Sequence, residues 1–275
     1  MIQPVSDSEK LLFTTLMIQS EESIGTGFIF SFENSSKTQS IPVLITNRHV
    51  INYKEKKTTK IILHTGSEGF KQVYDKSFEV AWTTSWTNHP TEDLCCTPFQ
   101  PLIDQIWEQN KKHVFYKTFS EDLVLGDKNL EDLNAIEDVI MVGYPCAIYD
   151  TKNNFPIIRK GITATHPAID YEKENKGLVD MSCVAGSSGS PILIYNQGSF
   201  TDKKGITTIG SRRILLGVLF GTYYQNLEGK VFRQEVPTKI VAGIQTQVPI
   251  NLGIYIKAEE IMILKQIIFG KYGIT

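Results

Sequence analysis

Val184-Ala185-Gly186-Ser187-Ser188-Gly189-Ser190-Pro191 is a turn of small residues between two apolar runs of strand length, 177–183 and 192–195. Small residues let backbone amides turn inward without steric conflict, and they leave a serine hydroxyl accessible. A nucleophilic serine needs this combination of an exposed hydroxyl and neighbouring backbone N–H groups. The same composition is typical of a plain turn between strands, so other parts of the chain must decide between the two interpretations.

Two upstream segments favour the nucleophile. The apolar run 43–45 leads into Thr46-Asn47-Arg48-His49-Val50, and Asp93 stands at the head of the apolar run 94–96. A neutral histidine is suited to take the proton of a serine hydroxyl, and a carboxylate on its other ring nitrogen fixes the tautomer. Glu92 and Asp104 are rival acids, but neither directly precedes an apolar strand, so we prefer Asp93.

With these segments the sequence resembles the trypsin/chymotrypsin-like serine peptidases, in particular the bacterial trypsin-like, HtrA-like branch. The resemblance rests on Gly25-Thr26-Gly27-Phe28, the box 46–50, Asp93-Leu94 and the stretch 186–191, and it spans residues 23–258. The family pattern at the last motif is Gly-Asp/Asn-Ser-Gly-Gly-Pro, so Ser187 and Ser190 are departures.

The resemblance implies a serine endopeptidase that works through an acyl-enzyme intermediate, without a cofactor or a metal. His49, Asp93 and Ser188 would form its catalytic triad, and the backbone N–H groups of Gly186 and Ser188 its oxyanion hole. Ser187 stands where zymogen-activated relatives have an aspartate that pairs with a newly cut N-terminus. We therefore expect no activation by insertion of the N-terminus.

The resemblance also places Ser182 at the base of a substrate pocket and Phe220, Gly221 and Thr222 along its wall. None of these residues carries a charge, so a preference for lysine or arginine is not supported.

A hydrolase of the α/β type is excluded by residue order, because its catalytic histidine follows the serine. All five histidines of this chain precede Ser188: His49, His64, His89, His113 and His166. The Gly-x-Ser-x-Gly motif also fails, because Ser190 occupies its last position.

Apolar runs of strand length recur along the chain, and their density favours antiparallel β-structure. We expect an all-β chain of two six-stranded antiparallel β-barrels, the chymotrypsin-like fold, with a C-terminal α-helix. The N-terminal barrel spans about residues 10–118, the connection 119–137, the C-terminal barrel 138–257 and the helix 258–269. The expected strands are 12–18, 27–32, 42–46, 60–64, 77–83, 93–98, 138–144, 158–166, 178–183, 191–195, 214–220 and 253–257, with a further helix at 101–112 and a surface loop at 196–213.

Composition excludes several partners. The net charge is −2 with scattered basic residues, which gives no indication of nucleic acid, and no apolar run is long enough to span a membrane. We expect a cytoplasmic protein, because the N-terminus lacks the layout of a signal peptide. The resemblance implies a protein of bacterial type, and because the chain reaches only residue 275 we expect no PDZ domain. Cys95, Cys96, Cys146 and Cys183 are expected to be free thiols.

Two functions remain open at this point. The first is an active endopeptidase that cleaves protein or peptide substrates. Such an enzyme needs restraint, and the requirement for an activating partner protein would supply it. The second is a catalytically silent or partner-activated module on the same fold that acts mainly by binding another protein.

Overall fold

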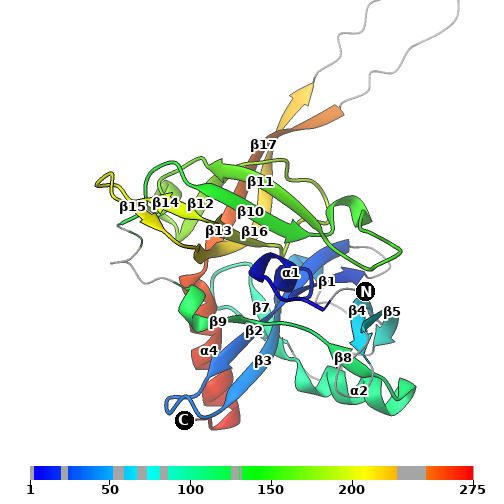
Figure 1. Ribbon diagram of the computed structural model, residues 1–275. Helices are drawn as coiled ribbons and strands as arrows, with labels where there is room; N and C mark the ends of the chain where they lie inside the picture. The colour runs from blue at the N-terminus through cyan, green and yellow to red at the C-terminus, as the bar shows by residue number, and fades with distance from the viewer. Residues whose placement is uncertain are drawn as a thin grey trace, which may run out of the picture.

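The computed structural model of the chain describes residues 3–19, 24–51, 59–66, 73–80, 86–124, 130, 132–227 and 246–274 (Figure 1). Strands dominate both halves. The N-terminal half contains α1 (Asp7–Leu11), β1 (Thr15–Gln19), β2 (Ile24–Glu33), β3 (Ser40–Thr46), η1 (Arg48–Val50), β4 (Thr59–Gly66), β5 (Val73–Val80), β6 (Thr87–Asn88), β7 (Cys95–Pro98), α2 (Gln100–Asn110), β8 (His113–Phe115), β9 (Phe119–Ser120) and η3 (Glu121–Leu123).

The C-terminal half contains β10 (Asp138–Gly143), η4 (Pro145–Ala147), β11 (Ile157–Thr163), η5 (Tyr171–Lys173), β12 (Lys176–Asp180), β13 (Pro191–Asn196), β14 (Ser199–Thr201), β15 (Thr207–Ile209), β16 (Arg212–Leu227), β17 (Thr246–Lys257) and α4 (Glu259–Tyr272). Six of its strands form a closed antiparallel barrel in the order β10-β11-β12-β17-β16-β13, as the sequence predicted for this half. Beyond the barrel, β16 and β17 continue as a two-stranded ribbon (Figure 1).

The strands of the N-terminal half form one sheet with the path β5-β4-β1-β2-β3-β7-β6, and β8 and β9 pair with β4 and β2. A second closed barrel was expected here, but the described residues show no pairing that closes this sheet. The expected strand 77–83 falls on β5 up to Val80, and residues 81–83 lie outside the described residues.

The apolar core is divided in a way that explains how the two halves stay together. One cluster fills the N-terminal sheet around Ile29, Leu44 and Phe99, and another fills the barrel around Val139 and Ile192. A third cluster lies at the junction and combines Phe28, Phe30 and Phe32 of β2 with Leu193, Val218 and Ile256 of the barrel and with Ile261, Leu264 and Ile268 of α4. Burial of this shared apolar surface fixes the relative position of the halves.

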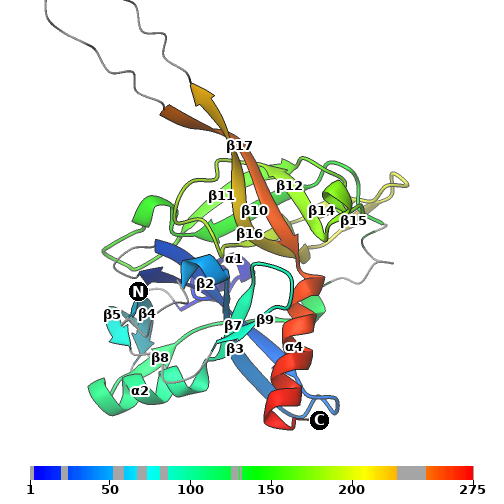
Figure 2. The same cartoon turned by 180° about the vertical axis from the view of Figure 1, so that it is seen from behind.

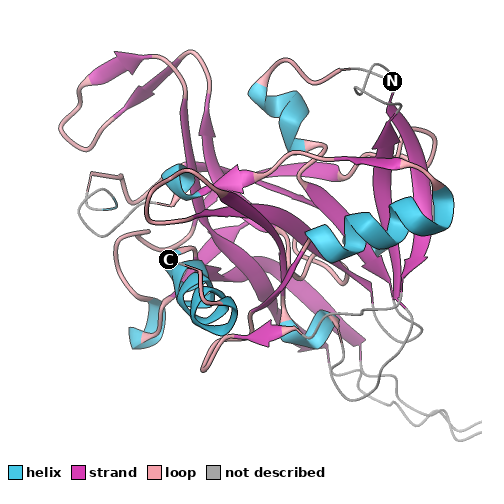
Figure 3. Ribbon diagram, turned by 90° about the horizontal axis from the view of Figure 1, so that it is seen from below, coloured by secondary structure: helices cyan, strands magenta, loops and turns pink. Residues whose placement is uncertain are grey.

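The buried residues of the C-terminal helix α4 recur at helical spacing, so they lie on one face of the helix. This face packs into the junction. From the barrel it runs beside the N-terminal sheet (Figure 2), where the rings of Phe269 and Phe32 lie 6.3 Å apart. It ends at Gly273, whose φ of 63° is typical of a helix C-cap. The longer helices lie at the periphery of the strands (Figure 3). No helix in the described ranges is long and apolar enough to span a membrane.

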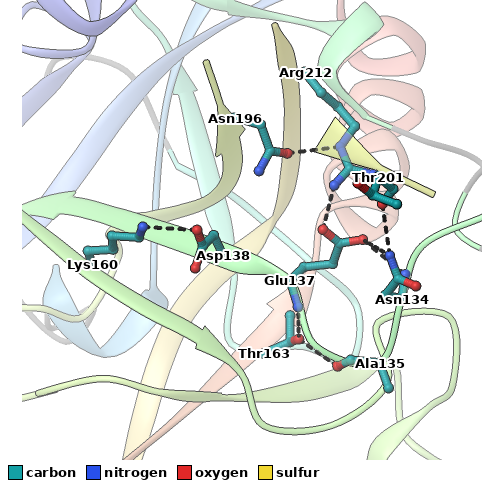
Figure 4. A network of polar contacts seen from close by, with 9 residues as sticks. All are labelled: Asn134, Ala135, Glu137, Asp138, Lys160, Thr163, Asn196, Thr201 and Arg212. Atoms are coloured by element: carbon teal, nitrogen blue, oxygen red, sulfur yellow. Dashed lines mark hydrogen bonds and ion pairs between the residues drawn. The ribbon is translucent and has the colours of Figure 1, made fainter. Parts of the chain in front are cut away.

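A buried polar network fastens the start of the barrel (Figure 4). Glu137 is 5% exposed; its carboxylate accepts the backbone N–H of Asn134 at 2.9 Å and forms an ion pair with Arg212. Its own N–H donates to Thr163 Oγ1 at 2.9 Å, and Arg212 Nε donates to Asn196 Oδ1 at 2.9 Å. The network therefore joins the connecting segment to β11, β13 and β16.

Candidate active site

His49 lies on the single turn η1 that follows β3. The next residue, Val50, is 2% exposed and packs so closely on Gly25 that a Cβ there would lie 2.4 Å from Val50 Cγ1. Because Val50 is anchored in the core, the His49 side chain stays outside it, with 48% of its surface exposed. Gly25 of β2 thus sets the position of the turn that carries the histidine.

Asp93 meets His49 from the loop before β7. Its Oδ2 lies 2.5 Å from His49 Nδ1, and its Oδ1 accepts the backbone N–H of His49 at 3.2 Å. Asn47 Nδ2 donates to the backbone carbonyl of Asp93 at 2.8 Å. The carboxylate favours the tautomer with its proton on Nδ1, which leaves Nε2 as an acceptor.

The rival acids have other partners. Glu92 lies 3.7 Å from Lys176 Nζ, and Asp104 accepts from Gln100 Nε2 at 2.8 Å. Of the three candidates, the structure therefore brings Asp93 to His49.

Ser188 lies in the loop between β12 and β13, which has to turn sharply. Gly186 and Gly189 both have positive φ values, 85° and 84°, which glycine adopts without strain. At Gly189 a Cβ would lie 1.9 Å from the carbonyl oxygen of Thr26. The small residues that made this stretch conspicuous in the sequence are thus required by both its turn and its close approach to β2.

Two carbonyl groups of this loop, those of Ala185 and Ser187, accept hydrogen bonds from backbone N–H groups. Ala185 O accepts from Cys146 N at 2.6 Å, and Ser187 O accepts from Ser190 N at 3.0 Å. In a trans peptide the N–H points opposite to the C=O, so the N–H groups of Gly186 and Ser188 point away from these anchors. Neither N–H has an acceptor among the described residues, and both are therefore available to an anion.

Thr26 of β2 holds this loop in place. It is fully buried, and its N–H donates to Ser188 O at 2.8 Å. Its hydroxyl donates to Gly186 O and accepts from Tyr144 N, each at 3.0 Å. Its carbonyl accepts from Oγ1 of Thr46, the residue three positions before His49, at 2.8 Å. One residue thus joins the serine loop, the 144–146 turn and the segment that carries the histidine.

A cavity of about 250 Å³ opens beside Ser188. Its lining residues carry no charge: Cys183, Val184, Ala185, Ser188, Leu219, Phe220, Gly221, Thr222 and Tyr224. Phe220, Gly221 and Thr222, which the sequence assigned to the wall of a substrate pocket, are among them. Ser182 does not line the cavity. It is exposed, its carbonyl accepts from Arg159 Nη1 at 2.8 Å, and Cys183 takes its place.

The remaining contact expected of a catalytic triad, between the histidine and the serine, is not formed. Within the described part of the chain, neither His49 Nε2 nor Ser188 Oγ makes a hydrogen bond. The neighbouring Ser187 and Ser190 are buried, and their hydroxyls have no partner among the described residues. Ser188 is therefore the one serine of the loop with a side chain at the cavity.

The Gly-Thr-Gly motif was noted in the sequence without a role for Thr26, and Cys146 was expected only as a free thiol, without its backbone contact to the serine loop. A small polar residue between two glycines on a buried strand was the available signal for Thr26. Cys146 has a left-handed φ of 50°, and nothing in its residue type indicates this.

All four cysteines are free thiols, and Cys146 is the exposed one. Burial raises the pKa of Cys183 to about 11, although the nearby Arg159 acts in the opposite direction. In the described ranges, no three His, Cys, Asp or Glu side chains gather as metal ligands.

No protein-family model matches the chain. A search of curated proteins found no match either. Among solved structures, an inactive form of Rv3671c from M. tuberculosis H37Rv, with one serine changed to alanine, has a TM-score of 0.46 and 16% identity and covers 96% of this chain and 89% of its own. A further inactive form of the Rv3671c protease has a TM-score of 0.43, 17% identity and coverages of 92% and 87%. The scabies mite inactivated protease paralogue S-I1 has a TM-score of 0.44, 13% identity and coverages of 95% and 97%.

Proposed function

We propose that this protein is a serine endopeptidase with a chymotrypsin-like arrangement of two barrels, in which His49, Asp93 and Ser188 form the catalytic triad. The serine loop carries the proposal: the N–H groups of Gly186 and Ser188 have no acceptor among the described residues, and their peptide carbonyls are bound behind them. Ser188 lies on the wall of a cavity that can take a substrate side chain. His49 is the general base, and its contact with Asp93 leaves Nε2 free to take a proton.

Acylation follows from these positions. As Ser188 Oγ bonds to the carbonyl carbon of the scissile peptide, its proton passes to His49 Nε2. The electron pair of the carbonyl bond moves onto its oxygen, and the N–H groups of Gly186 and Ser188 donate to that oxyanion. Removal of one such donor typically costs about 3 kcal/mol of transition-state stabilisation. His49 then protonates the leaving amine as the C–N bond breaks.

Deacylation repeats the same steps with water. His49 takes a proton from a water molecule, and the resulting oxygen nucleophile attacks the ester carbonyl of acylated Ser188. The tetrahedral oxyanion is bound by the same two N–H groups. Its collapse releases the carboxylic acid and returns the proton from His49 to Ser188. Asp93 stabilises the imidazolium in both halves of the reaction.

The cavity indicates the class of residue before the scissile bond. Because no lining residue carries a charge, a lysine or arginine side chain would lose its hydration without gaining a partner. Phe220, Leu219 and Cys183 offer apolar contacts instead. We therefore propose that uncharged side chains of small to medium size are preferred at this position.

Cleavage of a mixture-based peptide library tests this proposal, with products sequenced by mass spectrometry. We expect cleavage after uncharged residues, and we expect Ser188→Ala and His49→Ala to abolish it. Ser190→Ala, which removes a buried hydroxyl without a partner among the described residues, is the control and should cleave like the parent. Cleavage that survives in Ser188→Ala would contradict the assignment.

The open contact between His49 Nε2 and Ser188 Oγ favours one alternative, a catalytically silent or partner-activated module that acts mainly by binding a protein. An activating partner that brings the two side chains together belongs to this alternative. The active enzyme cleaves peptides alone, whereas the module does so only with its partner or not at all.

The free thiols fit a reducing compartment such as the bacterial cytoplasm, which is part of the proposal.

A further inference from the structure

His89 is a buried histidine at the start of the loop that carries Asp93. It is 2% exposed and directly follows β6. Its N–H donates to the carbonyl of Leu94 at 2.9 Å, which closes the loop 89–94. Its ring Nδ1 accepts the backbone N–H groups of Thr91 at 3.3 Å and Glu92 at 2.9 Å. The ring thus holds the backbone of the two residues immediately before Asp93.

The other ring nitrogen lies against the C-terminal helix. His89 Nε2 lies 2.8 Å from Oε2 of Glu260, a residue of the first turn of α4 that is only 5% exposed. The two atoms are close but do not form a hydrogen bond, so Glu260 holds the ring through a short electrostatic contact. The other carboxylate oxygen, Glu260 Oε1, accepts from Asn175 Nδ2. Since Nδ1 is an acceptor, a neutral His89 carries its proton on Nε2, the ring nitrogen on the side of Glu260.

Asp93 is consequently held from two sides. His49 of η1 contacts its carboxylate, and Asn47, which directly precedes η1, donates to its carbonyl. His89 orders the backbone that precedes it, and Glu260 holds the His89 ring. A buried imidazole–carboxylate pair gives little net stability compared with apolar residues of the same volume, so its value here lies in geometry. Shifts of about 1 Å in a catalytic group can cost on the order of a hundredfold in rate.

We propose that His89, held by Glu260, is a positioning residue that sets the placement of Asp93 against His49, and that α4 is thereby coupled to the active site. This inference rests on the proposed function for its effect on rate. The contact between Asp93 and His49 can be observed separately from catalysis.

Two substitutions separate the roles of the two ring nitrogens. In His89→Asn the side-chain oxygen can replace Nδ1 as acceptor for the loop, whereas the contact with Glu260 is lost. In His89→Gln the longer amide reaches toward Glu260, but the N–H groups of Thr91 and Glu92 lose their acceptor. We expect His89→Gln to lower the rate of labelling by a fluorophosphonate by at least about tenfold. His89→Asn should label within about threefold of the parent.

A proton NMR spectrum gives a readout that a purely structural role would not change. The Nδ1–H of His49, in short contact with Asp93, should give a low-field resonance that disappears in His49→Ala. We expect this resonance to persist in His89→Asn and to be lost or broadened in His89→Gln. Equal rates in the two variants, with the resonance unchanged in both, would overturn the proposal. A parent protein that shows the resonance but is never labelled contradicts the proposed function alone.

If the His89 variants do not fold, Glu260 offers the same test from the helix. Glu260→Gln keeps an oxygen near Nε2 and should label within about threefold of the parent. Glu260→Leu removes the carboxylate that holds the ring, so Nδ1 is no longer kept on the N–H groups of Thr91 and Glu92. We expect a loss of at least about tenfold together with loss of the resonance. Labelling of the leucine variant at the parent rate would refute the coupling.

Discussion

Thr26 illustrates how much of the candidate site depends on one hydroxyl. It binds Gly186 O and Tyr144 N, both buried, so its removal leaves an acceptor and a donor without partners. Thr26→Val keeps the shape of the side chain and should lower the free energy of unfolding by about 2 kcal/mol or more. The labelling rate should fall by at least about tenfold, because the loop that carries Gly186 and Ser188 is released.

Thr26→Ser is the matched control, since it keeps the hydroxyl and loses only a methyl group. It should cost about 1 kcal/mol in stability and leave labelling within a few fold. Urea unfolding and fluorophosphonate kinetics measure both effects. Equal labelling rates in the valine and serine variants would show that the hydroxyl does not order the loop.

The cysteines give a prediction about pH. Burial raises the pKa of Cys183 to about 11, so at pH 8 roughly one thiol in a thousand is a thiolate, the reactive form. Iodoacetamide should therefore modify the exposed Cys146 first, and alkylation of Cys183 should increase about tenfold per pH unit above pH 8.

Mass spectrometry of tryptic peptides measures these rates. Denatured protein without reductant should take up four alkyl groups, because all four thiols are free. If Cys183 in the folded protein reacted as fast as Cys146 at pH 8, the raised pKa would be contradicted.

At the level of the elements, patterns set by local alternation were predicted well. The barrel strands β10 to β13 and the helices α2 and α4 lie within a few residues of their expected ranges. His49, Asp93 and Ser188 could also be selected as candidates from the sequence, because each stands close to an apolar run of strand length. These signals are local and need no knowledge of pairing partners.

Features that depend on distant partners were not predicted. Strand β16 was expected to end at residue 220, but it continues to Leu227 because residues from Tyr224 to Leu227 pair with β17. The expected loop 196–213 contains the hairpin of β14 and β15, whose strands are only three residues long and contain no apolar run. A shift of one residue moves a side chain to the opposite face, and this explains why Cys183 rather than Ser182 lines the cavity.

For the molecule as a whole, the network of Figure 4 offers a direct test of how the barrel is fastened. Glu137 and Arg212 are 5% and 13% exposed in their side chains, whereas the adjacent pair of Asp138 and Lys160 is exposed at 49% and 66%. Glu137→Ala leaves a largely buried guanidinium without its carboxylate and should lower the free energy of unfolding by about 3 kcal/mol or more.

Asp138→Ala is the neighbouring control. Exposed ion pairs contribute little, so its effect should stay below about 1 kcal/mol. Urea unfolding of both variants measures the difference. Equal losses in the two variants would show that the buried network does not determine the stability of this half.

The central claim is that Ser188 is a nucleophile activated by His49. Incubation of the purified protein with a fluorophosphonate, followed by intact mass measurement and peptide mapping, tests it most directly. We predict one adduct per chain, located on Ser188, absent in Ser188→Ala and strongly reduced in His49→Ala, while Ser187→Ala and Ser190→Ala retain labelling. An unlabelled parent protein, or an adduct on any other residue, would contradict the claim.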